Sequence, residues 1–219
     1  MSKRRRVRRV YELLLRTHGR QHWWPAKTPF EVCVGAILTQ STSWGNAEKA
    51  IRNLKSEGLL NPRGLQTVNA GRLASLIKPA LYYNVKARKL KEFAGFLLDE
   101  YGGDVDNMRA VRRGRLREQL LDVWGLGPET ADSILLYALG KPSFVVDAYT
   151  RRIFGRLGMV GEEASYEDIR MFFESNLRAD ARLYNEYHAL IVEHGKNTCK
   201  AKPLCRGCCL SRMCAFKAA

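Results

Sequence analysis

Apolar residues recur at helical spacing along almost the whole chain, with glycine, proline or polar residues between the apolar segments. The pattern predicts helices over residues 10–15, 30–38, 47–54, 73–77, 85–101, 116–123, 130–139, 149–157, 166–177 and 181–192. Strand signals are scarce, because Phe144-Val145-Val146 is the only β-branched run and is too short to build a sheet. The sequence therefore predicts an all-α protein.

The charge of the chain is strongly positive. Its 219 residues include 37 Lys and Arg against 22 Asp and Glu, which gives a formal net charge of +15. Such an excess indicates a polyanionic partner, with nucleic acid first and an anionic membrane surface second. The basic start of the chain, residues 3–9, is either an arm that contacts phosphates or the solvated start of a helix.

The sequence shows no sign of a membrane segment. No apolar run approaches the roughly 18 to 20 residues of a membrane span, and no apolar segment of a signal peptide follows the basic start. We therefore expect a cytoplasmic, nucleoid-associated protein without a membrane partner. Cysteine thiols stay reduced in that compartment.

Four cysteines cluster near the end of the sequence in the pattern C-x5-C-x2-C-x5-C, at Cys199, Cys205, Cys208 and Cys214. Four thiolates bind either one tetrahedral zinc ion or a 4Fe-4S cluster. Zinc sites more often contain two Cys-x2-Cys pairs, whereas one short loop with one such pair favours the cluster. Two disulfides are the structural alternative. Cys209 is a spare thiol, and Cys33 is predicted to be a small buried hydrophobic residue.

A glycine-rich turn joins two of the predicted helices. Gly125 and Gly127 let the backbone turn sharply and approach another molecule, and Pro128 suits the first position of the next helix. The free N–H groups at that helix start can bind a phosphate. Most such turns only connect helices, but here a single carboxylate, Asp147, follows after an apolar run.

The turn and the aspartate resemble those of the helix-hairpin-helix DNA glycosylases of the endonuclease III superfamily, and the resemblance covers nearly the whole chain. The cysteine loop is similar to the 4Fe-4S loop of that family, although its first spacer has five residues where six is usual. The resemblance implies two helical lobes with a DNA-binding cleft between them. One is a helical barrel of residues 28–141 with the hairpin at 116–139, and the other joins residues 1–27 to residues 142–219 and carries the iron–sulfur loop. It also implies a monomer that binds double-stranded DNA containing a damaged base.

The resemblance also implies DNA-binding residues. The segment around Gln40 is similar to the one that supplies a glutamine to fill the gap left by a flipped base. The segment 82–87 is similar to the one that supplies an opposite apolar wedge, which puts Tyr82 near the wedge position. The alternatives are that Gln40 caps a helix and that Tyr82 packs on the surface. Other expected DNA contacts are Gly125, Gly127, Thr130, Lys196, Lys200, Lys202 and Arg206.

Position 129 departs from the bifunctional members of the family. Those enzymes carry a lysine two residues after the second hairpin glycine, and its amine forms the Schiff base needed for strand cleavage. Glu129 occupies that place, and residues 125–132 include no lysine. A carboxylate cannot form a Schiff base, so AP-lyase activity of the usual kind is not expected. Glu129 is either a second acid/base group or a first-turn glutamate favoured by the helix dipole.

Tryptophans near the barrel point to the substrate. They are either a hydrophobic plug between domains or an aromatic pocket, because indole faces attract a cationic base. With the hairpin and Asp147, they are similar to the 3-methyladenine glycosylases of the superfamily, which lack the lysine and are monofunctional. That branch does not generally need an iron–sulfur loop, so the base preference stays open. The expected base pocket comprises Trp23, Trp24, Pro25, Trp44 and Glu129.

The predicted mechanism uses one carboxylate. A damaged nucleotide is flipped out of the duplex, and ionised Asp147 stabilises the developing sugar cation or activates a water. One alternative is an endonuclease III-like glycosylase and AP lyase that acts on oxidised pyrimidines through another lysine. The other alternative is a protein that binds lesions in DNA without cleaving a bond.

Overall fold

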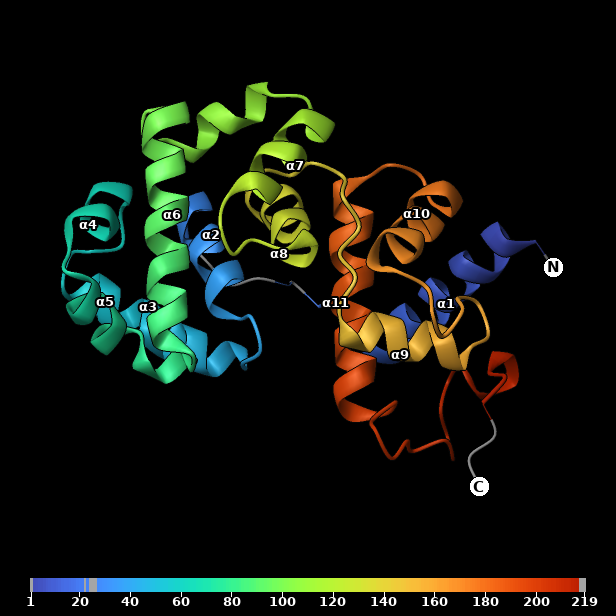
Figure 1. Cartoon of the computed structure of the whole chain (residues 1–219). Helices are drawn as coiled ribbons and strands as arrows, with labels where there is room; N and C mark the ends of the chain where they lie inside the picture. The colour runs from blue at the N-terminus through green and yellow to red at the C-terminus, as the bar shows by residue number, and fades with distance from the viewer. Residues whose placement is uncertain (1, 22, 24–26, 217–219) are drawn as a thin grey trace. The chain divides into compact units, whose positions relative to one another are not determined.

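The computed structural model describes residues 2–21, 23 and 27–216. These residues form helices and loops without a strand (Figure 1), so the all-α prediction is confirmed. The chain divides into two compact units, which we call the barrel unit (Trp24–Lys141) and the terminal unit (Met1–Trp23 with Pro142–Ala219). Within the described ranges, no helix is both long and apolar enough to cross a membrane.

The barrel unit is a bundle of helices around a common apolar core. Its longest helix, α6, packs against α2, α4 and α5 (Figure 1). The α-helices of this unit are α2 (Pro29–Leu38), α3 (Trp44–Ser56), α4 (Pro62–Thr67), α5 (Ala70–Leu76), α6 (Tyr83–Tyr101), α7 (Arg113–Asp122) and α8 (Pro128–Ser133). Shorter turns are η1 (Lys78–Ala80), η2 (Val105–Ala110) and the π-helical turn η3 (Ile134–Ala138).

Helix α2 lies in the core of the barrel unit. All of its residues from 31 to 38 are buried, which explains why the sequence shows a continuous apolar run instead of a stripe. The helix begins at Pro29 because Thr28 accepts a hydrogen bond from the N–H of Glu31 at 3.1 Å. The buried carboxylate of Glu31 pairs with Lys55 at 2.7 Å, so its charge is compensated.

The terminal unit consists of α1 (Lys3–His18), α9 (Ala148–Arg156), α10 (Tyr166–Asn176), α11 (Ala181–Asn197) and the 3-10 turn η4 (Ser211–Met213). An aromatic cluster forms its core, in which Phe144 stacks on Phe173 at 3.8 Å between ring centroids and meets Tyr184 and Tyr187 edge-on. The segment Phe144-Val145-Val146, which carries the one strand signal of the sequence, is therefore extended and buried in this core. The Tyr187 hydroxyl donates to the carbonyl of Val7 at 2.7 Å and ties α11 to α1.

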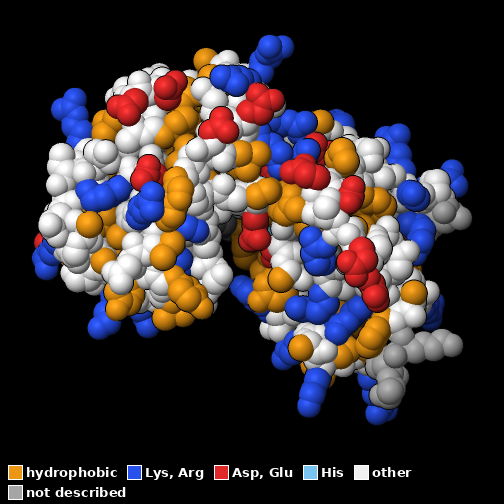
Figure 2. All heavy atoms as spheres, viewed as in Figure 1, with side chains coloured by type: hydrophobic (Ala, Val, Ile, Leu, Met, Phe, Trp, Pro, Cys, Tyr) orange, Lys and Arg blue, Asp and Glu red, His pale blue; other side chains and the backbone are white. Residues whose placement is uncertain are grey.

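The basic run at the start of the chain is helical. Helix α1 begins at Lys3, well before the apolar stripe that starts at Val10, and it buries Val7, Val10 and Leu14. Residues 3–9 are therefore the start of a helix, and their contact with phosphates stays a prediction. On the face shown in Figure 2, Lys and Arg side chains are spread over both units with Asp and Glu between them.

Two segments differ from the predicted helices. Helix α4 has no apolar stripe, since Leu65 is its one buried residue. The helix begins at Pro62 because the Asn61 side chain accepts a hydrogen bond from the backbone N–H three residues later. The predicted helix 130–139 is α8 followed by η3. At its end the Arg109 guanidinium donates to the carbonyls of residues 138 and 139, at 2.9 and 2.6 Å, so a distant side chain satisfies the helix terminus.

Helices α9 and α11 touch at Gly195, where an added Cβ would overlap the ring of Tyr149. We expect Gly195→Ala to lower the free energy of unfolding by about 1–3 kcal/mol, because the two helices would have to move apart. Urea unfolding of the purified protein measures this loss. Gly155→Ala in α9 is the matched control, since no atom lies within 4 Å of its added Cβ. Equal effects of the two substitutions would contradict this packing.

Candidate active site and metal centre

Asp147 is the N-cap residue of α9. Its Oδ1 accepts hydrogen bonds from the backbone N–H of Thr150 at 2.7 Å and from the Thr150 hydroxyl at 2.9 Å. The sequence produces this geometry because aspartate is a preferred N-cap and a threonine stands three residues later. One carboxylate oxygen is thus fixed by the helix start, which leaves the other free for a different partner.

The second oxygen of Asp147 faces α11. Oδ2 lies 3.5 Å from Nε2 of His188, a residue that is 5% exposed, and the Asp147 side chain itself is 14% exposed. Burial raises the pKa of Asp147, whereas the facing His188 and the two hydrogen bonds from Thr150 lower it. The lowering effects are larger in sum, so the pKa of Asp147 is below its usual value. The site therefore keeps a negative charge in a mostly closed setting.

Trp23 lies beside this pair. Its ring meets the ring of His188 edge-on at 6.4 Å between centroids, and Nζ of Lys196 lies 5.6 Å from the Trp23 centroid. The Trp23 Nε1 atom is buried and has no hydrogen-bond partner among residues 2–21, 23 and 27–216. The terminal unit therefore brings together Asp147, Trp23 and Lys196 of the predicted residues, and adds His188. Trp24 and Pro25 of the expected base pocket lie outside the described residues.

The glycine-rich turn forms a hairpin between α7 and α8 in the barrel unit. Gly125 has φ of +81°, and an added Cβ there would lie 2.7 Å from Cγ of Lys89, so both conformation and packing require glycine. Gly127 is the extended N-cap residue of α8, with no atom within 4 Å of an added Cβ. Glu129 is an exposed residue of the first turn of α8. Its side chain adjoins the helix end where the dipole favours negative charge.

Gln40 is hydrogen-bonded to the hairpin. Its amide Nε2 donates to the hydroxyl of buried Thr130 at 2.7 Å, and its Oε1 accepts from Nζ of Lys89. Gln40 therefore makes a tertiary link and does not cap α2, whose C-cap is Thr39. Lys89 is the residue that sequence reasoning missed here. It lies on α6, far from the hairpin in sequence, and only the need for glycine at position 125 could have indicated a close neighbour.

Tyr82 and Trp44, also in the barrel unit, have different settings. Tyr82 precedes α6, is 69% exposed and has φ of +46°, and the 50% exposed Leu81 before it has φ of +58°. Two consecutive residues with positive φ are a costly arrangement for side chains of this size. Trp44, the first residue of α3, packs half-buried against the barrel core. The structure thus exposes a large aromatic side chain on a strained turn.

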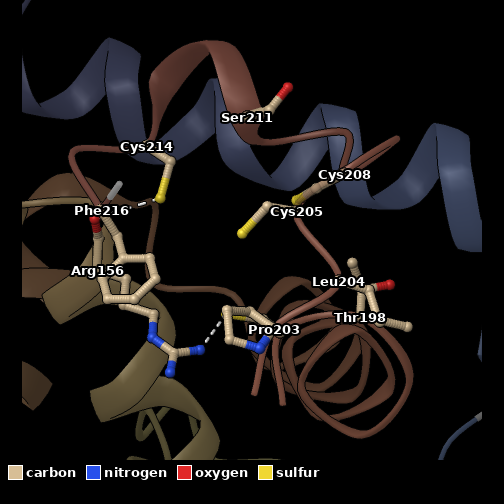
Figure 3. Close-up of a pocket in the computed structure, with 10 residues that line it drawn as sticks. Arg156, Thr198, Pro203, Leu204, Cys205, Cys208, Ser211, Cys214 and Phe216 are labelled. Atoms are coloured by element: carbon tan, nitrogen blue, oxygen red, sulfur yellow. Dashed lines mark hydrogen bonds between the residues drawn. The ribbon is translucent and has the colours of Figure 1, made fainter. Parts of the chain in front are cut away.

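The four cysteines of the C-terminal loop line one cavity of about 80 Å³ (Figure 3). All four are free thiols. Side-chain nitrogens lie beside two of the four sulfurs: Arg156 Nη1 lies 3.2 Å from Cys199 Sγ, and His194 Nε2 lies 3.6 Å from Cys208 Sγ. Such groups are typical neighbours of metal-bound thiolates. Convergent thiols with nearby N–H donors fit a metal centre with four cysteine ligands.

The other cysteines lie elsewhere. Cys209 does not line the cavity, and its sulfur lies near His18 and His194. Cys33 is fully buried in α2, and burial raises the pKa of its thiol, so the prediction of a small buried hydrophobic residue is confirmed. Around the loop the basic side chains are exposed, at Lys196, Lys200, Lys202 and Arg206.

Residues 34–179 match the model of the HhH-GPD superfamily base excision DNA repair proteins. The chain is 49% identical over 213 residues to a protein of Methanocaldococcus jannaschii that is named as a candidate DNA repair glycosylase, with 96% of each chain covered. It is 32% identical to endonuclease III of Thermotoga maritima, over 86% of this chain and 83% of that protein. The chain therefore belongs to the HhH-GPD superfamily.

Two solved structures share this fold. A non-covalent endonuclease III–DNA complex superposes with a TM-score of 0.85 over 98% of this chain and 96% of that chain, at 23% identity. The 3-methyladenine DNA glycosylase of H. pylori bound to 1,N6-ethenoadenine superposes with a TM-score of 0.76, at 29% identity, over 90% of this chain and 98% of that chain.

Proposed function

We propose that this member of the superfamily is a monofunctional DNA glycosylase, which flips a damaged base out of double-stranded DNA and hydrolyses its N-glycosidic bond. The observation that carries the proposal is the Asp147 carboxylate, which Thr150 fixes by two hydrogen bonds and which faces His188 in a mostly closed setting. As the glycosidic bond breaks, positive charge develops on the sugar. A carboxylate that is already fixed in place stabilises this charge without reorganising.

Hydrolysis needs a water and no covalent intermediate. The water oxygen bonds to C1′, its proton passes to Asp147 Oδ2, and the base leaves with the electron pair of the broken bond. Oδ1 already accepts two hydrogen bonds from Thr150, so Oδ2, which faces His188 at 3.5 Å, is the oxygen left to take the proton. Glu129 at the place of the lysine supports this route, because the hairpin offers no amine at that position.

The substrate class that we propose is an alkylated purine of the 3-methyladenine type. A base that already carries positive charge leaves readily, which suits a site without a nucleophilic amine. The likeness to the H. pylori enzyme, at 29% identity, supports this class. Lys196 already lies over the Trp23 ring, so a cationic base would stack on the opposite ring face or displace the ammonium group.

We further propose that Cys199, Cys205, Cys208 and Cys214 hold a 4Fe-4S cluster. When bound, such a cluster cross-links the loop through four thiolates, and the hydrolysis proposed here uses no electron transfer. The contacts with DNA at this end of the molecule would come from side chains of the protein. The exposed Lys196, Lys200, Lys202 and Arg206 would face the phosphates of the DNA.

Asp147→Asn should abolish base release while the protein stays folded and binds DNA. Asparagine caps a helix about as well as aspartate, but it cannot stabilise a cation by charge. The expected loss is about 3 kcal/mol or more of transition-state stabilisation. Single-turnover release of 3-methyladenine from a duplex measures the rate, and urea unfolding checks the stability.

Asp180→Asn is the matched control for this substitution. Asp180 caps α11 in the same unit through two backbone N–H groups, as Asp147 caps α9. We expect this variant to retain the rate of the parent protein. An Asp147→Asn variant that turned over within threefold of the parent would reduce Asp147 to a helix cap.

Borohydride should trap no covalent complex between the parent protein and DNA, and the abasic strand should stay uncut until alkali is added. Both results follow because Glu129 cannot form a Schiff base. Glu129→Lys should introduce weak trapping, since it places an amine where the bifunctional members have theirs. Gel electrophoresis of the trapped product measures both results. Robust trapping by the parent would contradict the monofunctional proposal.

A bifunctional glycosylase is the second candidate, and one observation favours it. Lys89 lies against the hairpin at Gly125, and burial lowers the pKa of its amine, which increases the neutral, nucleophilic fraction. The relative named endonuclease III in T. maritima is in keeping with this alternative. If the parent is trapped, Lys89→Gln should abolish trapping. Lys91→Gln, on the same helix, should leave it unchanged and serves as the control.

The cluster proposal predicts different effects for two neighbouring cysteines. Cys208→Ser should lower the iron content of anaerobically purified protein below the about four irons per chain of an intact cluster, because it removes one ligand. Cys209→Ser should leave the iron content unchanged, since Cys209 does not line the cavity. Iron and sulfide analysis measures both. A colourless parent protein with one zinc ion per chain would contradict the cluster.

A further inference from the structure

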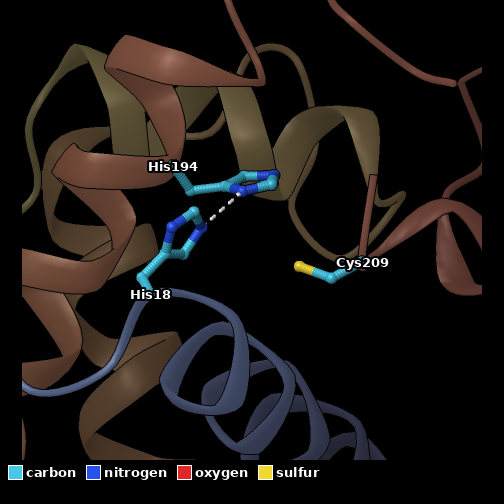
Figure 4. Close-up of side chains that lie close together, drawn as sticks. All are labelled: His18, His194 and Cys209. Atoms are coloured by element: carbon cyan, nitrogen blue, oxygen red, sulfur yellow. Dashed lines mark hydrogen bonds between the residues drawn. The ribbon is translucent and has the colours of Figure 1, made fainter. Parts of the chain in front are cut away.

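Three potential metal ligands meet beside the cysteine loop, outside the four-cysteine cavity. His18 is the last residue of α1, His194 lies in the last turn of α11, and Cys209 belongs to the loop. Their ligand atoms all lie within 4.8 Å of one another, and the Cys209 sulfur is directed toward the two imidazole rings (Figure 4). The ends of α1 and α11 and the cysteine loop thus supply one ligand each.

The two nitrogens of His194 face different partners. Nε2 lies 3.6 Å from Cys208 Sγ, whereas Nδ1 lies 3.1 Å from Nε2 of His18. If Nε2 carries the ring proton and donates it to the sulfur, Nδ1 presents a lone pair on the side of His18 and Cys209. A metal-binding histidine usually donates its other N–H to a neighbouring acceptor, and Cys208 is that acceptor here.

The spacing of the ligand atoms suits a tetrahedral ion. The imidazoles of His18 and His194 are hydrogen-bonded to each other at 3.1 Å (Figure 4), and an ion that binds both would replace the shared proton. Two nitrogens bound to one zinc at about 2.0–2.1 Å lie roughly 3.3 Å apart, which is a similar separation. A thiolate completes a set of two nitrogens and one sulfur, which zinc accepts well. His18 and Cys209 are only half-buried, so an ion can enter and a water can take the fourth position.

We propose that His18, His194 and Cys209 form a second metal site, for a divalent ion of the zinc type, separate from the four-cysteine centre. The site gives a role to Cys209, the thiol that the four-cysteine pattern leaves over. The ion would cross-link the end of α1 to the end of α11 and to the loop. Its occupancy does not depend on which reaction the protein catalyses.

The test uses the full chain with its iron centre loaded, washed with a chelator and titrated anaerobically with Zn²⁺ alone. We expect one zinc per chain to bind while the iron content stays constant. His18→Gln and Cys209→Ser should each weaken zinc binding on the order of 100-fold, since even loss of an outer-shell partner typically costs 10–100-fold. Isothermal titration calorimetry measures the affinity, and elemental analysis of the same samples measures zinc and iron.

Cys33→Ala is the matched control, because it removes the free thiol of the barrel unit and should leave zinc binding unchanged. A second readout is Co²⁺, whose thiolate charge-transfer absorption should appear in the parent difference spectrum and vanish in Cys209→Ser. The proposal is overturned if the parent binds no zinc, if both variants bind it as tightly as the parent, or if zinc enters only as iron is lost.

Discussion

The carboxylate of Asp147 is the group on which the arrangement of the terminal unit depends. One oxygen completes the start of α9 through Thr150, and the other faces His188 of α11. A buried negative charge is costly unless hydrogen bonds and a nearby positive or polar group compensate it, and these partners do so. Because one oxygen is committed to the helix, the side chain cannot rotate away. The requirement for a stable helix start thereby fixes the direction of the second oxygen.

An equivalent constraint operates at the hairpin of the barrel unit. The stem of Lys89 fills the space over Gly125, and its amine binds Gln40, which in turn binds Thr130. Each polar group in this chain of contacts has a partner, so a change at one position leaves another unsatisfied. The shape of the hairpin is therefore set by the long helix α6 as well as by its own glycines. A substitution at position 89 would remove the hydrogen bond to Gln40 and would thereby also affect the hydrogen bond between Gln40 and Thr130.

Periodicity predicted the fold class and the strongly apolar helices, because burial determines both. The pattern could not reveal α4, whose start depends on the capping residue Asn61, and it placed the start of α1 too late because the first turns are basic. Spacing alone was enough to group the four cysteines, since they are close in sequence. The neighbours His188 and Lys89 could not be predicted, because they reach Asp147 and Gly125 through tertiary contacts between distant segments. The roles assigned to Asp147 and Glu129 stay predictions.

Helix α9 connects the carboxylate to the cysteine loop. Asp147 stands at its start, while toward its other end Arg152 donates to the carbonyl of Cys199 at 2.8 Å and Arg156 donates to the carbonyl of Ala201 at 2.9 Å. Gly195 lets α9 pack directly on α11. A bound cluster would therefore hold the far end of the helix that positions Asp147. For the hydrolysis proposed above, the role of the proposed cluster would then be to fix the helix that positions the Asp147 carboxylate.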